Sequence, residues 1–209
     1  HSAKDIVSHY LPSLISAECI ETMSYEKEKK SLNDFNFNFT IKDNNEILDL
    51  INAPVRLIHP IKITGDMNHL AHKMNLIIDV PYLQQKNKLI KDTRLSVNID
   101  KDKDMCQLFA TTKMPSKKGE TLVNLKCNGV NDRIDTKIDW DINNTRAFNG
   151  NIMFSSLFQR NEDNTLFSNI NIHPSKLVFN DTAWTISPAH IVVNNKDITV
   201  SGFDAYRDN

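Results

Sequence analysis

Four aspartates form the densest set of side chains that could do chemistry in this sequence: Asp132, Asp135, Asp139 and Asp141. Carboxylates grouped in this way could bind calcium or act as the acid and base of a glycosidase. In an extended chain the last three share one face, while Ile134, Ile138 and Trp140 take the other. The glycine and terminal glutamate of a calcium-binding loop are absent. The simpler interpretation is the solvated side of a half-buried strand.

The histidines are scattered, and His59, His69 and His72 come closest to a cluster. A spacing of three puts His69 and His72 on opposite faces of an extended chain. A metal site needs converging ligands with second partners behind them. We therefore interpret these as surface histidines and expect no metal and no cofactor.

Three cysteines, Cys19, Cys106 and Cys127, are widely spaced and odd in number. They form neither a disulfide framework nor a zinc site. Cys106 and Cys127 come near each other if the segment between them folds as a hairpin, so a disulfide between them stays open. Free cysteine is among the most buried residue types, which favours two buried thiols.

Composition and motifs narrow the function classes further. The dinucleotide-binding, P-loop, HExxH, CxxC and GxSxG motifs are absent, and we expect no enzymatic activity. Lys and Arg number 25 against 26 Asp and Glu, a net charge of -1, which makes nucleic acid an unlikely partner. No apolar run is long enough to span a bilayer. The abrupt start at His1 suggests a piece of a longer protein whose targeting signals lie elsewhere.

Alternation of apolar and polar residues is the strongest structural signal. In FNFNFTIK, Phe35, Phe37 and Phe39 share one face and Asn36 and Asn38 the other, which predicts a half-buried strand. Similar patterns follow in HKMNLIIDVPYL, TRLSVNID, MCQLFATTKM, TLVNLKC, DRIDTKIDWDIN, GNIMFSSLFQR and LFSNINIHPSKLVF. About ten strands with turn signals between them predict an antiparallel sandwich, barrel or long meander.

Helical signals are confined to the first part of the chain. Residues 6–15 have helical spacing, and DNNEILDLINAP predicts a short helix that Asn44 or Asn45 caps and Pro54 ends. Turns are assigned to Asn180-Asp181, Ser187-Pro188 and 194–196. We expect residues 1–44 to form a helical and strand prelude and residues 45–209 to form one β domain.

Large apolar side chains recur on one face of strand after strand. By parity we expect the following residues to share that face: Phe37, Phe39, Leu76, Ile78, Val97, Leu108, Leu125, Ile138, Trp140, Phe154, Ile172 and Ile191. A sealed core and a groove open to an apolar ligand have the same alternation, so both interpretations stay open. A bulge shifts parity by one residue.

Three segments carry a resemblance to a known family: LINAPVRLIHPIKITGDM, CNGVNDRIDTKIDWDINNTRAFNGNIMFSSLF and INIHPSKLVFNDTAWTISPAHIVVNNKDITVSGF. In the last segment the matching positions are Pro174, Ser175, Asn180, Asp181, Trp184, Ile186, Pro188, Val200 and Phe203. Over most of residues 45–203 the chain resembles the C-terminal part of a TamB-type translocation and assembly module, of the AsmA-like group, in the form found in the Bacteroidetes.

The resemblance implies a periplasmic segment of a parent protein anchored in the inner membrane. It implies a long curved antiparallel sheet folded into an open taco-like trough with an apolar inner face. The implied roles are phospholipid transport between the membranes and assembly of outer-membrane proteins. Its partners would be phospholipid acyl chains and an outer-membrane β-barrel protein of the Omp85 type. Exposed sheet edges would let this segment self-associate.

The alternative function is a closed β-sandwich that binds surface carbohydrate or protein. It would have a sealed core and aromatic residues exposed on loops. Trp184 is the aromatic residue that lies near predicted turns.

Overall fold

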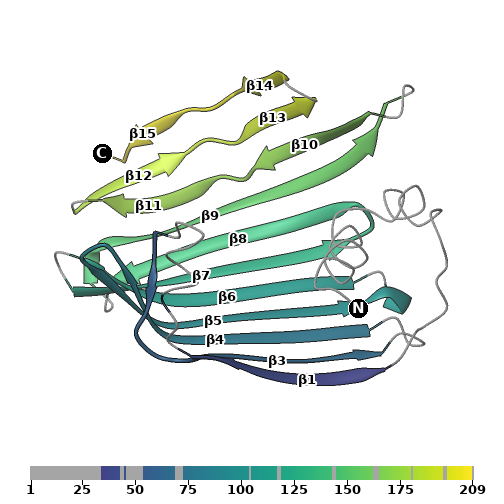
Figure 1. Cartoon of the computed structure of the whole chain (residues 1–209). Helices are drawn as coiled ribbons and strands as arrows, with labels where there is room; N and C mark the ends of the chain where they lie inside the picture. Colours follow the sequence, from purple (N-terminus) through teal and green to yellow (C-terminus); the bar gives the residue numbers. More distant parts are fainter. Residues whose placement is uncertain are drawn as a thin grey trace.

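The computed structural model of the chain is an all-β structure, as the alternation predicted. It describes residues 34–42, 45, 54–68, 73–103, 105–116, 119–142, 145–161, 165–179, 181–194 and 197–208. Its strands form a single 15-stranded sheet (Figure 1). Each pair of neighbouring strands is antiparallel.

The first strands are β1 (Phe35–Ile41), β2 (Arg56–Leu57), β3 (Ile61–Asn68), β4 (Lys73–Gln85), β5 (Lys88–Asp100), β6 (Met105–Ser116), β7 (Gly119–Val130) and β8 (Arg133–Ile142). They are followed by β9 (Thr145–Arg160), β10 (Leu166–Ile172), β11 (Ser175–Phe179), β12 (Thr182–Ile186), β13 (Ala189–Asn194), β14 (Asp197–Ser201) and β15 (Ala205–Arg207). A 3-10 helix, η2 (Lys101–Lys103), connects β5 to β6.

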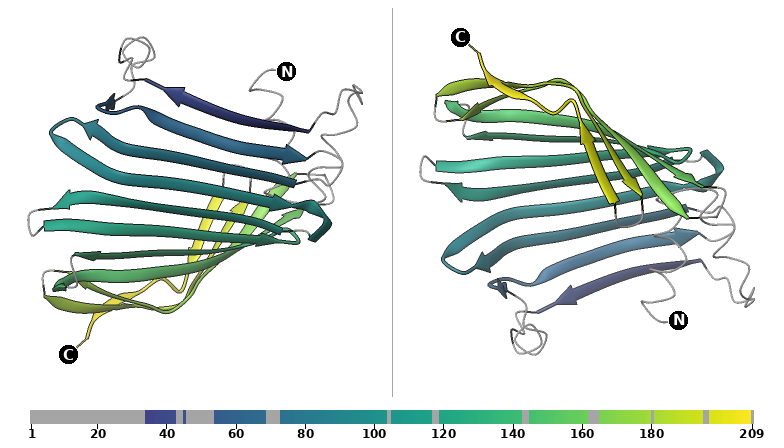
Figure 2. Two further views of the ribbon diagram at one scale, coloured as in Figure 1. Left: turned by 90° about the horizontal axis from the view of Figure 1, so that it is seen from below. Right: turned by 90° about the horizontal axis from the view of Figure 1, so that it is seen from above.

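The main path of the sheet follows the order β1-β3-β4-β5-β6-β7-β8-β9-β10-β13-β14. The sheet is open, because β1 and β14 are the two ends of this path. It is also strongly curved. Figure 1 shows β13 and β14 far above β4 and β5, and the view from above in Figure 2 shows them crossing over the middle of the sheet.

Tight turns built on Asn and Asp allow so many strands to follow one another directly. Asn131 and Asp132 have φ angles of 45° and 57°, and they connect Val130 to its partner Arg133. Two successive residues with positive φ define the hairpin turn whose twist matches that of the strands. Asp181 (φ 60°) lies in the turn before β12. Asn and Asp thus form these turns in a chain that has only 5 glycines among its 209 residues.

The last part of the sheet consists of three lines of strand segments, β10 with β11, β12 with β13 and β14 with β15. We call the break that crosses all three lines the crease. Both β10 and β11 pair antiparallel with β9, so they run in the same direction, broken only at His173-Pro174. The breaks between β12 and β13 and between β14 and β15 lie beside it, at Ser187-Pro188 and at residues 202–204. Proline interrupts a ladder because it has no N–H to donate. Figure 1 shows each pair of segments nearly end to end.

The prediction of a turn at Ser187-Pro188 was therefore wrong. The chain does not reverse there, because β12 and β13 continue in one direction. Breaks of this kind also explain why the sheet has more strand segments than the predicted ten or so. The predicted helices at residues 6–15 and 44–53 lie outside the described residues, apart from Asn45. Strand β1 falls in the predicted prelude, yet it pairs with β3 in the same sheet.

Two glycines on the sheet are required by close packing against aromatic rings. Gly65 lies opposite Phe37, and a Cβ placed on it would lie 2.5 Å from the Phe37 ring and 2.7 Å from the backbone oxygen of Asn75. Gly150 lies opposite Trp140, and a Cβ there would lie 2.8 Å from the indole. Each glycine lets an aromatic ring of the facing strand come close to its backbone.

Replacing Gly65 by alanine should therefore destabilise the sheet. The added methyl group must displace both a ring and a backbone carbonyl, which we expect to cost about 1–3 kcal/mol. Urea denaturation measures this cost as a change in the free energy of unfolding. Thr64→Ala, one residue away and on the opposite face, is the matched control. Equal losses for the two variants would contradict the close approach of Phe37 to Gly65.

Candidate functional site

The strand register brings the predicted apolar residues to one face of the sheet. Ten strands contribute to a continuous line of partners, which we call the apolar row: Phe37, Gly65, Leu76, Val97, Leu108, Cys127, Thr136, Phe154, Ile172 and Ala189. It crosses the strands from β1 to β13. Side chains at facing positions of paired strands lie on the same face, so the apolar row is a surface feature of one face.

A second line of partners runs beside the first on the same face: Phe39, Ile63, Ile78, Leu95, Ala110, Leu125, Ile138 and Ile152. The remaining predicted residues also belong to this face. Trp140 is two residues after Ile138 on β8 and so shares its face. Ile191 lies opposite Ile170, which shares the face of Ile172 on β10. Thus every residue predicted to share the apolar face lies on it.

Burial differs along this face. Val97 is 8% exposed, and it belongs to a buried cluster with Met67, Met74 and Ile99. Towards the β1 edge the face opens, since Phe39 is 59% exposed. Our selection of face residues omitted Met67, Met74 and Ile99. Their alternation with polar neighbours is as regular as that of the residues we chose, so parity could have found them.

Aromatic side chains gather where β8, β9 and β11 meet. The ring of Phe148 lies 6.2 Å from that of Trp140 and 5.8 Å from that of Phe179, measured between centroids. Leu177 of β11 pairs with both Gly150 and Trp184, which extends the apolar face to β12. Phe148 alternates regularly with Gly150, Ile152 and Phe154 along β9, so parity could have found it. Phe179 was missed because the extra residue at the crease breaks the simple parity count.

The opposite face carries a matching line of polar residues, and Phe109, Met153 and Leu157 are also exposed on it. Eleven facing positions from β1 to β14 form what we call the polar row: Asn36, Asp66, Asn75, Asn98, Gln107, Asn128, Asp135, Ser155, Asn171, His190 and Ser201. Several members bond across strands, as Asn75 does to Asp66 at 2.9 Å. The ring of His190 lies 2.8 Å from the Asn171 amide oxygen. Three of the four aspartates singled out in the sequence, Asp135, Asp139 and Asp141, also lie on this face, as predicted.

A serine, a histidine and an aspartate meet on the polar face. The Ser155 hydroxyl lies 2.6 Å from an Asp135 carboxylate oxygen and 2.8 Å from Nε2 of His173. In a catalytic triad the histidine stands between the serine and the acid and takes the serine proton. Here serine is in the middle and donates its proton to Asp135, so His173 Nε2 is not placed to receive it. The cluster instead joins β8 and β9 to the crease.

Arg133 completes this cluster. It donates from Nε to Asp135 at 2.9 Å and from a terminal nitrogen to Ser155 at 3.2 Å. Partial desolvation alone would raise the pKa of Asp135. Hydrogen bonds from Ser155 and Arg133, together with the charge of Arg133, outweigh it, so the pKa lies below its usual range. The carboxylate is therefore held in its charged form.

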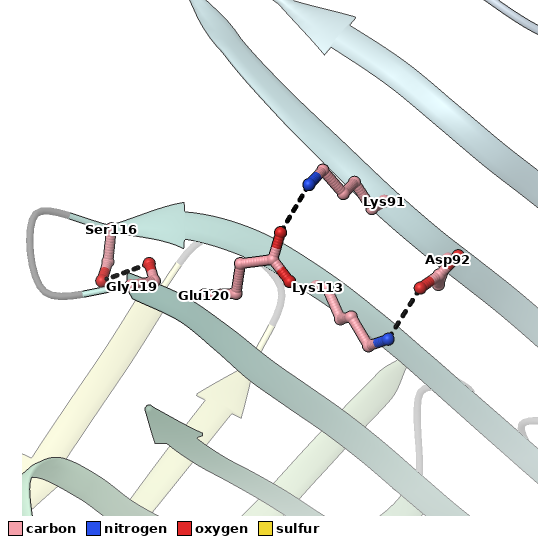
Figure 3. A network of polar contacts seen from close by, with 6 residues as sticks. All are labelled: Lys91, Asp92, Lys113, Ser116, Gly119 and Glu120. Carbon is pink, nitrogen blue, oxygen red and sulfur yellow. Dashed lines mark hydrogen bonds and ion pairs between the residues drawn. The ribbon is translucent and has the colours of Figure 1, made fainter. Parts of the chain in front are cut away.

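A bulge in β5 is held by two ion pairs (Figure 3). Lys91 and Lys113 lie opposite each other, which would place like charges together. Each has its own acid: Lys91 bonds Glu120 at 2.6 Å, and Lys113 bonds Asp92 at 2.7 Å. These hydrogen bonds raise the pKa of both lysines. Asp92 sits at the bulge with φ 48°, which turns it towards Lys113. Both pairs are solvent-exposed, so they set geometry more than stability.

The two described cysteines are free thiols. Cys106 faces Gly129 and Cys127 faces Leu108, so the two are diagonal neighbours on the apolar face. Diagonal positions lie about 7–8 Å apart, beyond the usual Cα separation of a disulfide. Burial raises the pKa of Cys106 to about 11, with Cys127 adding to the effect. Both thiols behave as small apolar groups, and Thr136 donates a hydrogen bond to Cys127 at 3.6 Å.

Within the described ranges, no three His, Cys, Asp or Glu side chains converge as metal ligands would. His69 and His72 lie outside those ranges. No helix in the described part is both long and apolar enough to cross a membrane.

Comparisons with known proteins found no match. Neither a family model, nor a curated protein, nor a solved structure matches this chain. The two faces of the sheet are therefore the basis for assigning a function.

The Asp135 cluster predicts a specific pH dependence. Because the folded-state pKa of Asp135 is depressed, its stabilisation is present above the unfolded pKa of about 4 and is lost as pH falls through the folded value. Ser155→Ala should raise the pKa of Asp135, which carboxyl NMR titration measures. Its loss of unfolding free energy should be larger at pH 7 than at pH 2–3.

Asp135→Asn supplies the control for this prediction. His173 also contacts Ser155, so it is changed to Gln in the same background. With neither Asp135 nor His173 present, Ser155→Ala should change stability by the same amount at both pH values. An unchanged pKa of Asp135 in Ser155→Ala would show that the serine does not stabilise the charged form.

Proposed function

We propose that this chain is a non-enzymatic segment of a periplasmic, TamB-like protein whose parent is anchored in the inner membrane. Its curved sheet would form an open, taco-like trough lined by the apolar row and its neighbouring line. The trough would carry phospholipid acyl chains between the inner and outer membranes, and the segment would assist the assembly of outer-membrane proteins. The uninterrupted apolar row from β1 to β13 is the observation on which this proposal rests.

The length of the apolar row suits an extended chain of methylenes. Strands in a sheet are about 4.8 Å apart, so the nine intervals from β1 to β13 measure roughly 40 Å along the curve. One lipid leaflet has a hydrocarbon depth of about 15 Å, half that of a bilayer core. A single acyl chain is thus shorter than the row and could move along it while remaining on apolar side chains.

The energetics need no dedicated binding residue. Burying a methylene group is worth about 0.8 kcal/mol, and this term has no directional requirement. A ligand that moves must bind similarly at each step, because one much tighter site would trap it. Repetition of Leu, Ile, Val and Phe at strand spacing meets this condition better than a single polar pocket.

Single-sheet topology favours the trough over the closed sandwich. Every described strand belongs to one sheet, and the apolar row and the polar row lie on its opposite faces. Assembly of outer-membrane proteins, including an Omp85-type β-barrel partner, would draw on a different feature. The unpaired backbone groups of edge strands can pair with an incoming strand.

Photo-crosslinking tests which face contacts lipid. A photoreactive residue at Ile138 or Phe154 should crosslink to phospholipid acyl chains, whereas one at Asp139 should not, because it projects from the polar face. Phe109 is a second control, since it is 42% exposed and lies opposite Lys126 on the polar face. Equal crosslinking at Asp139 and Ile138, read by mass spectrometry, would remove the basis for the trough.

Intrinsic fluorescence offers a test that needs no modified residue. The chain has two tryptophans, and both lie on the apolar face: Trp140 opposite Gly150, and Trp184 opposite Leu177. Phospholipid with brominated acyl chains should quench both, whereas lipid brominated only in its headgroup should quench much less. Trp140→Phe and Trp184→Phe separate the two signals. No difference between the lipids would contradict acyl-chain contact.

A further inference from the structure

The two edges of the sheet are not equivalent. Strand β14 is exposed along its whole length, and its two apolar residues, Ile198 and Val200, are 67% and 53% exposed. At the other edge, the Phe37 ring leans inwards over Gly65 and lies 5.8 and 5.4 Å from the rings of Phe35 and Phe39. The aromatic residues of β1 thus pack among themselves, whereas β14 has no aromatic residue and its two apolar side chains stay more than half exposed beside Val193 and Ile191 of β13.

Strand direction decides which edges of two copies can join. Each step along the main path is antiparallel, so direction alternates and β1 and β14 run the same way. Joining β14 of one copy to β1 of another, with the apolar faces on one side, would make a parallel pair. Pairing two β14 strands about a two-fold axis perpendicular to the sheet gives an antiparallel pair and keeps both apolar faces on the same side.

The hairpin before β14 indicates which of its backbone groups are free. Asn194 and Asp197 pair across a two-residue connection, and such a pair is ordinarily hydrogen-bonded. Alternation then directs the N–H and C=O groups of Thr199 towards β13. Those of Ile198 and Val200 point outwards, away from the sheet.

We propose that β14 is a homotypic interface, in which two copies pair their β14 strands antiparallel about a two-fold axis at Thr199. This register puts Ile198 opposite Val200 of the second copy in both symmetry-related positions, with their outward backbone groups bonded. Asp197 lies opposite Ser201, so no like charges face each other. The apolar faces of two sheets become one continuous face. The proposal depends on the edge alone and is independent of lipid binding.

The interface is small. It involves a strand of 5 residues from each copy, well below the usual size of a stable protein interface. The dimer should therefore be concentration-dependent, and sedimentation equilibrium over a wide range of protein concentrations should detect it.

Disulfide trapping tests the register directly. In this arrangement the two Thr199 residues form a non-hydrogen-bonded pair with Cα atoms about 4.5 Å apart, within disulfide range. In a background with the three native cysteines changed to serine, Thr199→Cys should form covalent dimers under mild oxidation. Asn38→Cys, at the middle of β1, is the matched control and should remain monomeric. Equal trapping of both, or trapping of Asn38→Cys alone, would overturn the proposal.

Val200→Pro supplies a second measurement that does not require crosslinking. Its ring removes an outward N–H while leaving the bonds to β13 in place, so the monomer should keep its circular dichroism spectrum. Dimerisation in sedimentation should be lost. Undiminished dimerisation of folded Val200→Pro, or a wild-type chain that stays monomeric at millimolar concentration, would show that β14 is not the interface.

Discussion

Cross-strand register is the constraint on which the rest of this structure depends. Side chains alternate between faces with a period of two, so a slip of one residue in any pair would move all apolar residues of that strand to the polar side. Here the partners remain matched from Phe37 on β1 to Ala189 on β13. The polar row remains matched over the same strands, and its cross-strand bonds, such as Ser155 to Asp135, hold the alignment from the other face.

Positions where the alternation is interrupted follow from local chemistry. Gly65 and Gly150 contribute no side chain to the apolar face, but an aromatic ring from the facing strand covers each of them. Thr136 and Cys127 appear polar in sequence, yet the Thr136 hydroxyl donates a hydrogen bond to the Cys127 sulfur, so the two groups satisfy each other on the apolar face. Asp92 takes a left-handed conformation at the β5 bulge and there neutralises Lys113, which would otherwise face Lys91 alone.

Much of this arrangement can be predicted from sequence, because alternation is a local signal. DRIDTKIDWDIN and GNIMFSSLFQR each identify the two faces of their own strand, and this was sufficient to place Ile138 and Phe154 on one face. The crease was not predictable in the same way. A proline between two short alternating runs is typical of a turn, and only the pairing of β12 and β13 with β11 and β10 shows that the chain continues. Phe179 was missed because parity cannot be carried across the register shift at the crease, whereas Phe148 follows from Phe154 by simple alternation along β9.

The crease also shows how the sheet changes direction without losing its apolar face. Phe154 of β9 pairs with Ile172, and Gly150 pairs with Leu177. Four steps along β9, from Phe154 to Gly150, therefore correspond to five steps from Ile172 on β10 to Leu177 on β11. The break at His173-Pro174 thus contains one extra residue. That residue reverses the parity of everything after it, which puts the odd-numbered Leu177 on the same face as the even-numbered Ile172. Between the outer strands the partner positions continue unshifted across the break, from Ile172 with Ala189 to Ser175 with Ile186. The inserted residue is thus absorbed once, against β9, and the outer strands bend together while their apolar side chains remain on one surface.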